Sequence, residues 1–179
     1  MGERYPGEIT IGGKVPAAVL DELLGQVAAT NVSVGGYDGP AFECHSAEEL
    51  SKVLDESGHL FLVDAEASYG QFEELEVFCV EHGIPFDRHS DAKYEFDCQN
   101  VYYRPGMERP VAVASNNCQE DLTDVDKVRP VARELARLAT AKVSHEELLA
   151  AVVKAGKELD EALPPEVEPL PPLEIVECP

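Results

Sequence analysis

Basic residues are scarce in this chain. Its 179 residues include 14 Lys and Arg against 35 Asp and Glu, which gives a formal net charge of −21 at pH 7. Proteins hold a nucleic-acid backbone largely through Lys and Arg that displace counterions from the phosphates, and the same cations attract proteins to anionic membranes. The shortage therefore excludes general electrostatic binding to nucleic acid or to a membrane surface, and it favours basic proteins as partners.

Long apolar runs and paired cysteines are also missing. No stretch approaches 18 consecutive apolar residues, so we expect no transmembrane helix. The N-terminus lacks a basic region followed by an apolar run, which is the pattern of a secretory signal. The cysteines are odd in number and none is in C-x-x-C spacing: Cys44, Cys79, Cys98, Cys118 and Cys178. We therefore expect reduced thiols, no bound metal or cofactor, and a cytoplasmic location.

The apolar residues that are present recur with regular spacing. They make up 44% of the chain, which is enough for a core. Helical spacing and capping patterns predict helices at 16–29, 46–58, 71–82 and 125–141, and a last helix that starts at Ser144. Alternation and apolar runs predict strands at 8–11, 32–34 and 59–65, and an antiparallel meander at 86–114. This order predicts an α+β fold, a mainly antiparallel sheet with helices on one face and a C-terminal αα-hairpin.

We expect three parts along the chain: an acidic α+β domain at 1–122, a helical hairpin packed on it at 123–162, and a Pro-rich acidic tail at 163–179. The tail contains six prolines, four Glu and no basic residue, a composition typical of polyproline-like structure. A frayed terminus is the expected state of such a segment. The alternative for residues 173–176 is an edge strand added to this domain, to a second copy or to a partner.

The negative charge is concentrated in one part of the chain. Residues 15–87 contain fifteen acidic residues and one basic residue, Lys52, a net charge of −14, whereas the hairpin is nearly balanced. Acidic residues in the first turn of a helix favour its N-terminus, which is sufficient reason for many of them. Soluble surfaces ordinarily mix both signs, however, so helix stability does not account for the missing counter-charges.

Carboxylates on helix and strand faces can imitate duplex DNA, which presents about one negative charge per 1.7 Å of its axis. This hypothesis predicts a partner-binding surface of twelve acidic residues: Glu48, Glu49, Asp64, Glu66, Glu73, Glu74, Glu76, Glu81, Asp87, Asp91, Glu95 and Asp97. The partner is then a basic protein that itself binds nucleic acid. The hairpin supplies structure or, as an option, a homodimer contact.

The stretch from Gly83 to Asp91, with the sequence GIPFDRHSD, resembles segments of uncharacterised small acidic proteins of bacterial mobile elements. In size and charge the chain is similar to phage- and plasmid-borne inhibitors of restriction and CRISPR complexes. The resemblance covers a small part of the chain and no functional motif. It implies an inhibitor of a host defence protein and not an enzyme.

Two alternatives come from other residues. An immunity-type or other interaction module would bind without mimicry through an aromatic anchor, for which the candidates are Tyr37, Tyr69 and Tyr102. A metal-dependent enzyme would use the ionisable residues that alternate along the meander, Asp87, His89 and Asp91. The same alternation is typical of the exposed polar face of a one-sided sheet.

Overall fold

The structure, a computed structural model, describes residues 3–93 and 97–177 and confirms the α+β class. The strands are β1 (Arg4–Ile11), β2 (Lys14–Pro16), β3 (Ser33–Val34), β4 (Leu60–Ser68), β5 (Phe86–Ser90), β6 (Gln99–Tyr103), β7 (Val111–Ala114) and β8 (Glu174–Val176). The helices are α1 (Leu20–Ala29), entered through a 3-10 turn at Ala17–Val19, α2 (Ala47–Val53), α3 (Glu73–Glu81), α4 (Val125–Thr140) and α5 (His145–Ala162).

Six of the strands form one sheet in the order β3-β4-β1-β5-β6-β7, and every neighbouring pair is antiparallel. The predicted meander is confirmed as β5, β6 and β7. β1 begins at Arg4, earlier than predicted, and lies between β4 and β5. The register between β1 and β4 shifts between Tyr5 and Gly7, so Pro6 sits at an irregularity where a strand tolerates its missing N–H.

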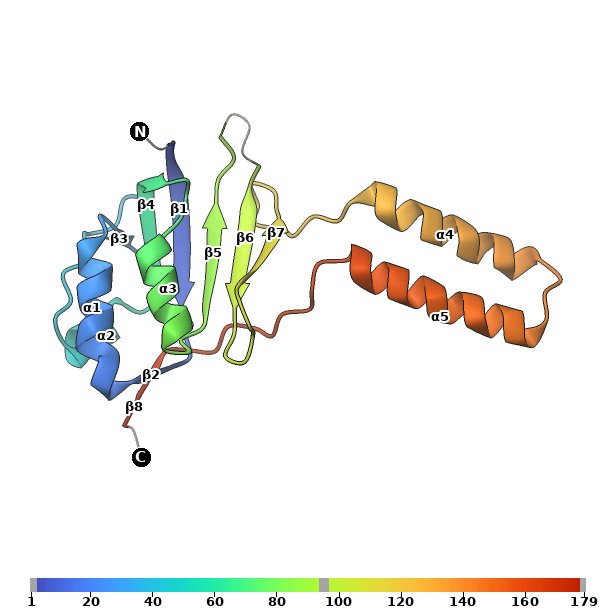
Figure 1. The fold of residues 1–179 in the computed structure, drawn as a ribbon. Coiled ribbons are helices and arrows are strands. Elements are labelled where there is room, and N and C mark those ends of the chain that lie inside the picture. The colour runs from blue at the N-terminus through green and yellow to red at the C-terminus, as the bar shows by residue number, and fades with distance from the viewer. Residues whose placement is uncertain (1–2, 94–96, 178–179) are drawn as a thin grey trace. The chain divides into compact units, whose positions relative to one another are not determined.

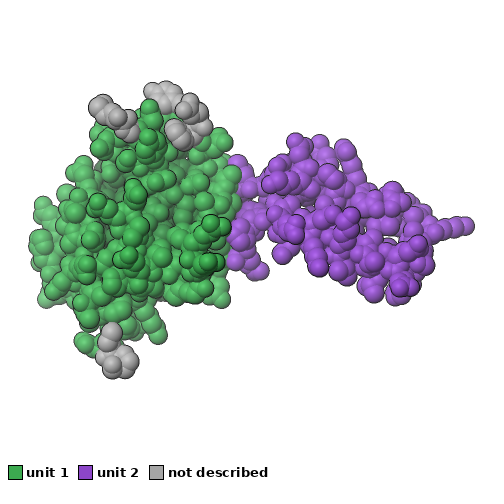
Figure 2. Space-filling model, in the orientation of Figure 1, with its two compact units in different colours: residues 1–120, 167–179 green, residues 121–166 purple. Residues whose placement is uncertain are grey.

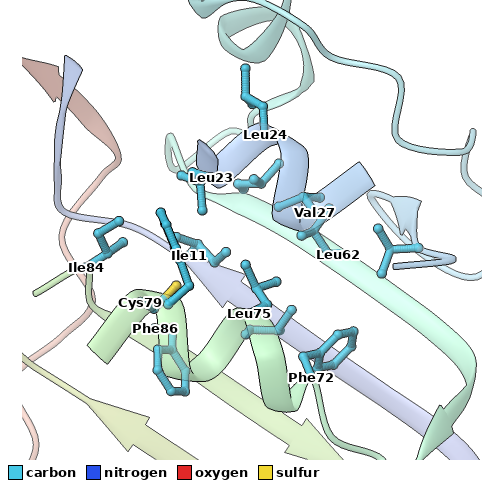
Figure 3. Close-up of a cluster of buried hydrophobic side chains, with 14 of the residues drawn as sticks. Ile11, Leu23, Leu24, Val27, Leu62, Phe72, Leu75, Cys79, Ile84 and Phe86 are labelled. Carbon is cyan, nitrogen blue, oxygen red and sulfur yellow. The ribbon is translucent and has the colours of Figure 1, made fainter. Parts of the chain in front are cut away.

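Helices α1 and α3 lie side by side across one face of the sheet (Figure 1). Their buried side chains include Leu23 of α1 and Leu75 and Cys79 of α3. Figure 3 shows these side chains gathered with those of the strands, among them Ile11 and Phe86. Each large apolar side chain contributes about 1.5–3 kcal/mol by leaving water, and this layer therefore holds the helices on the sheet.

Local hydrogen bonds fix the starts of two helices. Ser46 caps α2 because its side chain accepts from the N–H of Glu49 at 3.2 Å. The carboxylate of Glu49 accepts from the N–H of His45 and not from that of Ser46, so the capping box predicted for α2 is half formed. The box predicted for α5 is complete, with Ser144 and Glu147 each accepting a backbone N–H of the other.

The end of the chain packs on the α+β part. β8 pairs in parallel with β2, and the N–H of Leu173 donates to the carbonyl of Gly58 at 2.8 Å. A Cβ on Gly12 would lie 2.2 Å from the carbonyl oxygen of Pro171, so this close approach requires glycine. The expectation of a frayed terminus is therefore wrong for residues 173–176, which add as a strand to their own domain.

The chain divides into two compact units (Figure 2). Unit 1 comprises residues 1–120 and 167–179, and unit 2, the helical hairpin of α4 and α5, comprises residues 121–166. Unit 2 has ten acidic and seven basic residues, a net charge of −3, so unit 1 carries −18 of the total of −21. Within the part of the chain that the structure describes, no helix has both the length and the apolar character needed to cross a membrane.

Candidate functional site

Helices α1, α2 and α3 carry exposed carboxylates with almost no counter-charge. These residues, called here the acidic helical surface, are Asp21, Glu22, Glu48, Glu49, Glu73, Glu74 and Glu81. Lys52 is the one basic residue of the three helices, and its Nζ lies 2.7 Å from Oε1 of Glu48. Because both members of that pair are exposed, the pair contributes little to stability. A single lysine among seven carboxylates leaves the surface with a strongly negative net charge.

Helix stability explains only part of this surface. The acidic residues in the first turns of α1, α2 and α3 interact favourably with the helix dipole, by about 0.3–1 kcal/mol each. Glu81 is instead the last residue of α3, where a negative charge is unfavourable, and neither α1 nor α3 has a basic residue in its last turn. The negative charge of Glu81 therefore has no structural reason within α3.

A buried arginine pairs with one predicted carboxylate, which is itself half-buried. Arg88 of β5 is 4% exposed, and its Nε lies 2.9 Å from Oε1 of Glu76 in α3. Its terminal nitrogens donate to the side chains of Ser90 and Gln99. Burial lowers the pKa of Arg88, and the carboxylate of Glu76 opposes that shift. Arg88 shares its strand parity with Phe86, which is the signal in the sequence that places it on the helix side.

A second buried arginine engages another predicted carboxylate. Arg104 follows β6 and is 8% exposed. Its Nη1 lies 2.6 Å from Oδ1 of Asp87 and its Nη2 lies 3.2 Å from Oδ2, a bidentate pair. Its Nε donates to the carbonyl of Glu168 at 2.8 Å, so the same guanidinium ties β5 to the tail. Asp87, like Glu76, thus has an internal partner.

The other predicted carboxylates are spread over several elements. Asp64 is half-buried and accepts from the N–H of Glu66, which is exposed. Asp91 is half-buried and Asp97 is exposed. Glu95 lies outside the described residues. The predicted residues that lie on helices and are exposed are therefore those of α2 and α3 other than Glu76.

The sheet face opposite the helices holds a groove of about 280 Å³. Two rows of cross-strand neighbours line it, and the loop after β7 adds Gln119: Glu8, His89 and Asn100 form one row, and Thr10, Asp87 and Tyr102 form the other. On β5 the predicted alternation therefore places Asp87 and His89 on the same open face.

Hydrogen bonds connect the side chains of this groove. His89 is 6% exposed, and its Nδ1 lies 2.7 Å from Oδ1 of Asn100. Because a carboxamide oxygen only accepts, Nδ1 of His89 carries the proton. Nδ2 of Asn100 donates to the carbonyl of Gln119, whose Nε2 donates to Glu8. His89 is therefore a buried member of a network, and not the exposed residue that a one-sided sheet predicts.

This network bears on the metal-site hypothesis. Nε2 of His89 lies 3.4 Å from Oδ1 of Asp91, while Asp87 is held by Arg104. Across residues 3–93 and 97–177, no three or more His, Cys, Asp or Glu side chains are grouped so that they could hold a metal ion. Two of the three residues of the hypothesis thus have partners within the chain, Asp87 in Arg104 and His89 in Asn100.

Two of the candidate tyrosine anchors are exposed. Tyr37 is 48% exposed and Tyr69 is 41% exposed, whereas Tyr102 is half-buried in the groove. Burial and the carboxylates of Glu8 and Asp91 raise the pKa of Tyr37, whose hydroxyl donates to Glu8. Tyr69 has a φ of 54°, a left-handed conformation that costs a non-glycine residue roughly 1–2 kcal/mol.

A hollow of about 410 Å³ lies beside α3. Apolar and acidic side chains line it together with Gln71: Val77, Val80, Pro110, Glu73, Glu76 and Glu81. Val77 is 51% exposed. Apolar surface next to carboxylates suits a Lys or Arg side chain, because the methylene stem is buried while the charged end meets the acids.

Unit 1 thus has two features with functional geometry. The acidic helical surface is exposed, and the hollow beside α3 adjoins it through Glu73 and Glu81. In the groove on the open sheet face, by contrast, most of the polar side chains form hydrogen bonds within the chain. Comparisons with protein families, curated proteins and solved structures give no match for this chain.

Proposed function

We propose that this chain is an acidic inhibitor that occupies the nucleic-acid-binding surface of a basic partner protein. The observation that carries the proposal is the acidic helical surface, whose one cation, Lys52, is already paired with Glu48. Such an array offers the repeated negative charge that a DNA- or RNA-binding groove recognises. We place the protein in the cytoplasm, as an inhibitor of the anti-restriction or anti-CRISPR type.

The charge of Glu81 at the C-terminus of α3 supports this proposal most directly. Glu81 lies where it opposes the dipole of α3, so its charge costs stability and needs a reason outside the helix. The hollow that Glu81 shares with Val77 accepts a basic side chain. A partner groove rich in Lys and Arg meets both features at once.

The test starts with capture from a bacterial lysate on the immobilised full chain at about 50 mM salt, followed by elution at about 500 mM. The proposal expects basic nucleic-acid-binding proteins in the eluate. A purified captured protein is then mixed with a labelled DNA duplex. The chain should displace the duplex, and raising the salt should weaken the complex steeply, because a multiply charged interface is screened.

A matched pair of variants assigns the surface. The first variant removes three charges from the acidic helical surface by changing Glu73, Glu74 and Glu81 to Gln. We expect its affinity for the captured partner to fall about tenfold or more. Changing Glu161, Glu166 and Glu177 to Gln removes the same charge from exposed positions elsewhere and should change affinity little. A complex that holds duplex and chain together, or that is insensitive to salt, contradicts the proposal.

The second candidate is an interaction module that binds without mimicry, and the strained, exposed Tyr69 favours it. Backbone strain at an exposed aromatic residue is typical of positions kept for binding. In that case Tyr69→Ala lowers affinity for the captured partner more than the Glu73, Glu74 and Glu81 triple variant does. The mimicry proposal expects the reverse order.

A further inference from the structure

Unit 2 buries very little apolar surface. Its buried side chains are Val131 and Leu138 of α4 and Ala155 of α5. A two-helix hairpin with so small a core lacks the apolar burial needed to hold it folded in water. Its helices therefore need a further apolar surface to cover them.

One face of α5 is apolar and exposed. Leu149, Val152 and Val153 are 57%, 48% and 54% exposed, and the exposed Gly156 follows on the same face. Positions i, i+3, i+4 and i+7 lie along one side of a helix, so these residues form a continuous strip. We call these four residues the α5 stripe.

Nothing within its own chain explains why position 156 is a glycine. It lies in the interior of α5, where glycine costs about 1 kcal/mol relative to alanine. A Cβ built on it meets nothing within 4 Å, so neither close packing nor a positive φ requires glycine here. A glycine on an apolar helix face is explained if a second helix approaches closely at that point.

Charge and surface composition indicate what covers the stripe. Unit 2 carries −3 and unit 1 carries −18, so two copies repel least where their hairpins meet. Among the described residues of unit 1, the large apolar side chains that are exposed are Tyr37, Tyr69 and Val77, one each on separate segments. A second hairpin offers a matching apolar strip, and unit 1 does not.

We propose that α5 packs antiparallel against α5 of a second copy through the α5 stripe. The stripe is symmetric under such a two-fold: Leu149 faces Gly156 of the second copy, and Val152 faces Val153. A large side chain thus meets the one position without a side chain in each half of the contact. The same register brings His145 opposite Asp160 of the second copy, which are both exposed and can form a hydrogen bond.

Sedimentation equilibrium of the full chain tests this contact. We expect a dimer at micromolar concentration, and Leu149→Lys or Val153→Lys should raise the dissociation constant about 100-fold, because each places a charge inside a buried apolar strip. Ala150→Lys is the matched control. Ala150 is exposed on α5 outside the stripe, so the variant should remain dimeric.

The variant Gly156→Ala tests whether this face of α5 is covered by a second helix or exposed to solvent. On a free face alanine improves helix stability and does not affect assembly. In the proposed dimer its methyl group lies against Leu149 of the second copy, so the dissociation constant should rise about tenfold, and Gly156→Leu should raise it further. A monomeric wild-type chain, or a dimer unchanged by Leu149→Lys and Gly156→Leu, overturns the proposal.

The salt dependence keeps this proposal distinct from the proposed function. Salt screens the repulsion between two copies of unit 1, so the dimer should be as tight or tighter at about 500 mM salt than at 50 mM. Binding of the basic partner should weaken over the same range. Far-UV circular dichroism shows whether each variant keeps its helices, so that loss of the dimer is not confused with loss of the fold.

Discussion

At the scale of single residues, Glu76 is the acidic side chain whose neutralisation we expect to cost most. Its carboxylate is 2.9 Å from Nε of the buried Arg88. Glu76→Gln leaves that guanidinium without a counter-charge, which should lower the free energy of unfolding by about 3 kcal/mol. Urea unfolding followed by circular dichroism measures the loss.

Glu73→Gln is the matched control for this change. Glu73 lies in the same first turn of α3 but is exposed, so its neutralisation removes only a dipole interaction of less than about 1 kcal/mol. Equal losses for the two variants would mean that the contact between Glu76 and Arg88 does not stabilise the fold.

Cys79 gives a prediction about pH. Burial, and then the carboxylate of Glu76, raises the pKa of the Cys79 thiol from 9.0 to about 12. Above pH 9 the unfolded chain therefore loses this proton while the folded chain keeps it, so stability falls as pH rises. The loss from this group between pH 8 and pH 10 should be about 1.4 kcal/mol.

Comparison with Cys79→Ala isolates that contribution from other groups that titrate at high pH. The variant should be less stable at both pH values, because it leaves a cavity. Its stability should nevertheless fall by about 1.4 kcal/mol less than that of the wild type over this range. Parallel pH dependences in urea unfolding would contradict the raised pKa.

The place of a single residue was predictable where a local sequence pattern determines it. It was not predictable where it depends on a contact with a residue distant in sequence. Alternation along β5 placed Asp87 and His89 on one face, and the same parity rule places Arg88 among the core residues. Nothing local signals that Arg104 pairs with Asp87 or that the carbonyl of Gln119 accepts from Asn100. Those contacts depend on register and loop path.

At the scale of elements, the contact between Gly12 and the tail gives a prediction. A Cβ at this position would lie 2.2 Å from the backbone oxygen of Pro171, which cannot move unless the tail moves. Gly12→Ala should therefore lower the free energy of unfolding by about 2 kcal/mol and expose residues 164–176 to protease. Urea unfolding and limited proteolysis with mass spectrometry measure the two effects.

Gly25→Ala is the control for the general effect of replacing glycine. Gly25 lies in the exposed interior of α1, and a Cβ there meets nothing within 4 Å, so the change should stabilise the helix by about 1 kcal/mol. Protection of the tail in the Gly12 variant would show that the tail does not depend on this contact.

Most elements were predictable because their signals are local. Helical spacing in 16–29 and 71–82 matches α1 and α3, and Ser144 with Glu147 marks the start of α5. The first half of β1 was not predicted, because Pro6 and Gly7 are typical of a turn. Pairing with β4 and β5 outweighs that local preference.

At the scale of the whole molecule, the fold joins segments from opposite ends of the sequence. β8 pairs with β2, and Arg104 binds the carbonyl of Glu168. The composition of the tail predicts polyproline-like structure but not a docking site, because the site consists of Gly12 and neighbours that are adjacent only after the sheet has formed. The charge block was predictable from sequence, whereas its division into exposed and internally paired carboxylates required the structure.

The net charge of −18 on unit 1 leads to the last prediction, which concerns stability against salt. Like charges on the acidic helical surface repel in the compact state more than in the unfolded chain, so the folded state is disfavoured at low ionic strength. Urea unfolding should therefore show a higher midpoint at about 500 mM NaCl than at about 20 mM. Glu81→Lys should raise stability at low salt by about 0.3–1 kcal/mol, because it removes an acid and places a cation at the C-terminus of α3, and it should weaken the salt dependence. A wild-type midpoint that falls with salt would mean that the exposed ion pairs outweigh the repulsion. The stabilised Glu81→Lys variant should at the same time bind the basic partner less tightly, because the charge that opposes folding is the charge that we assign to binding.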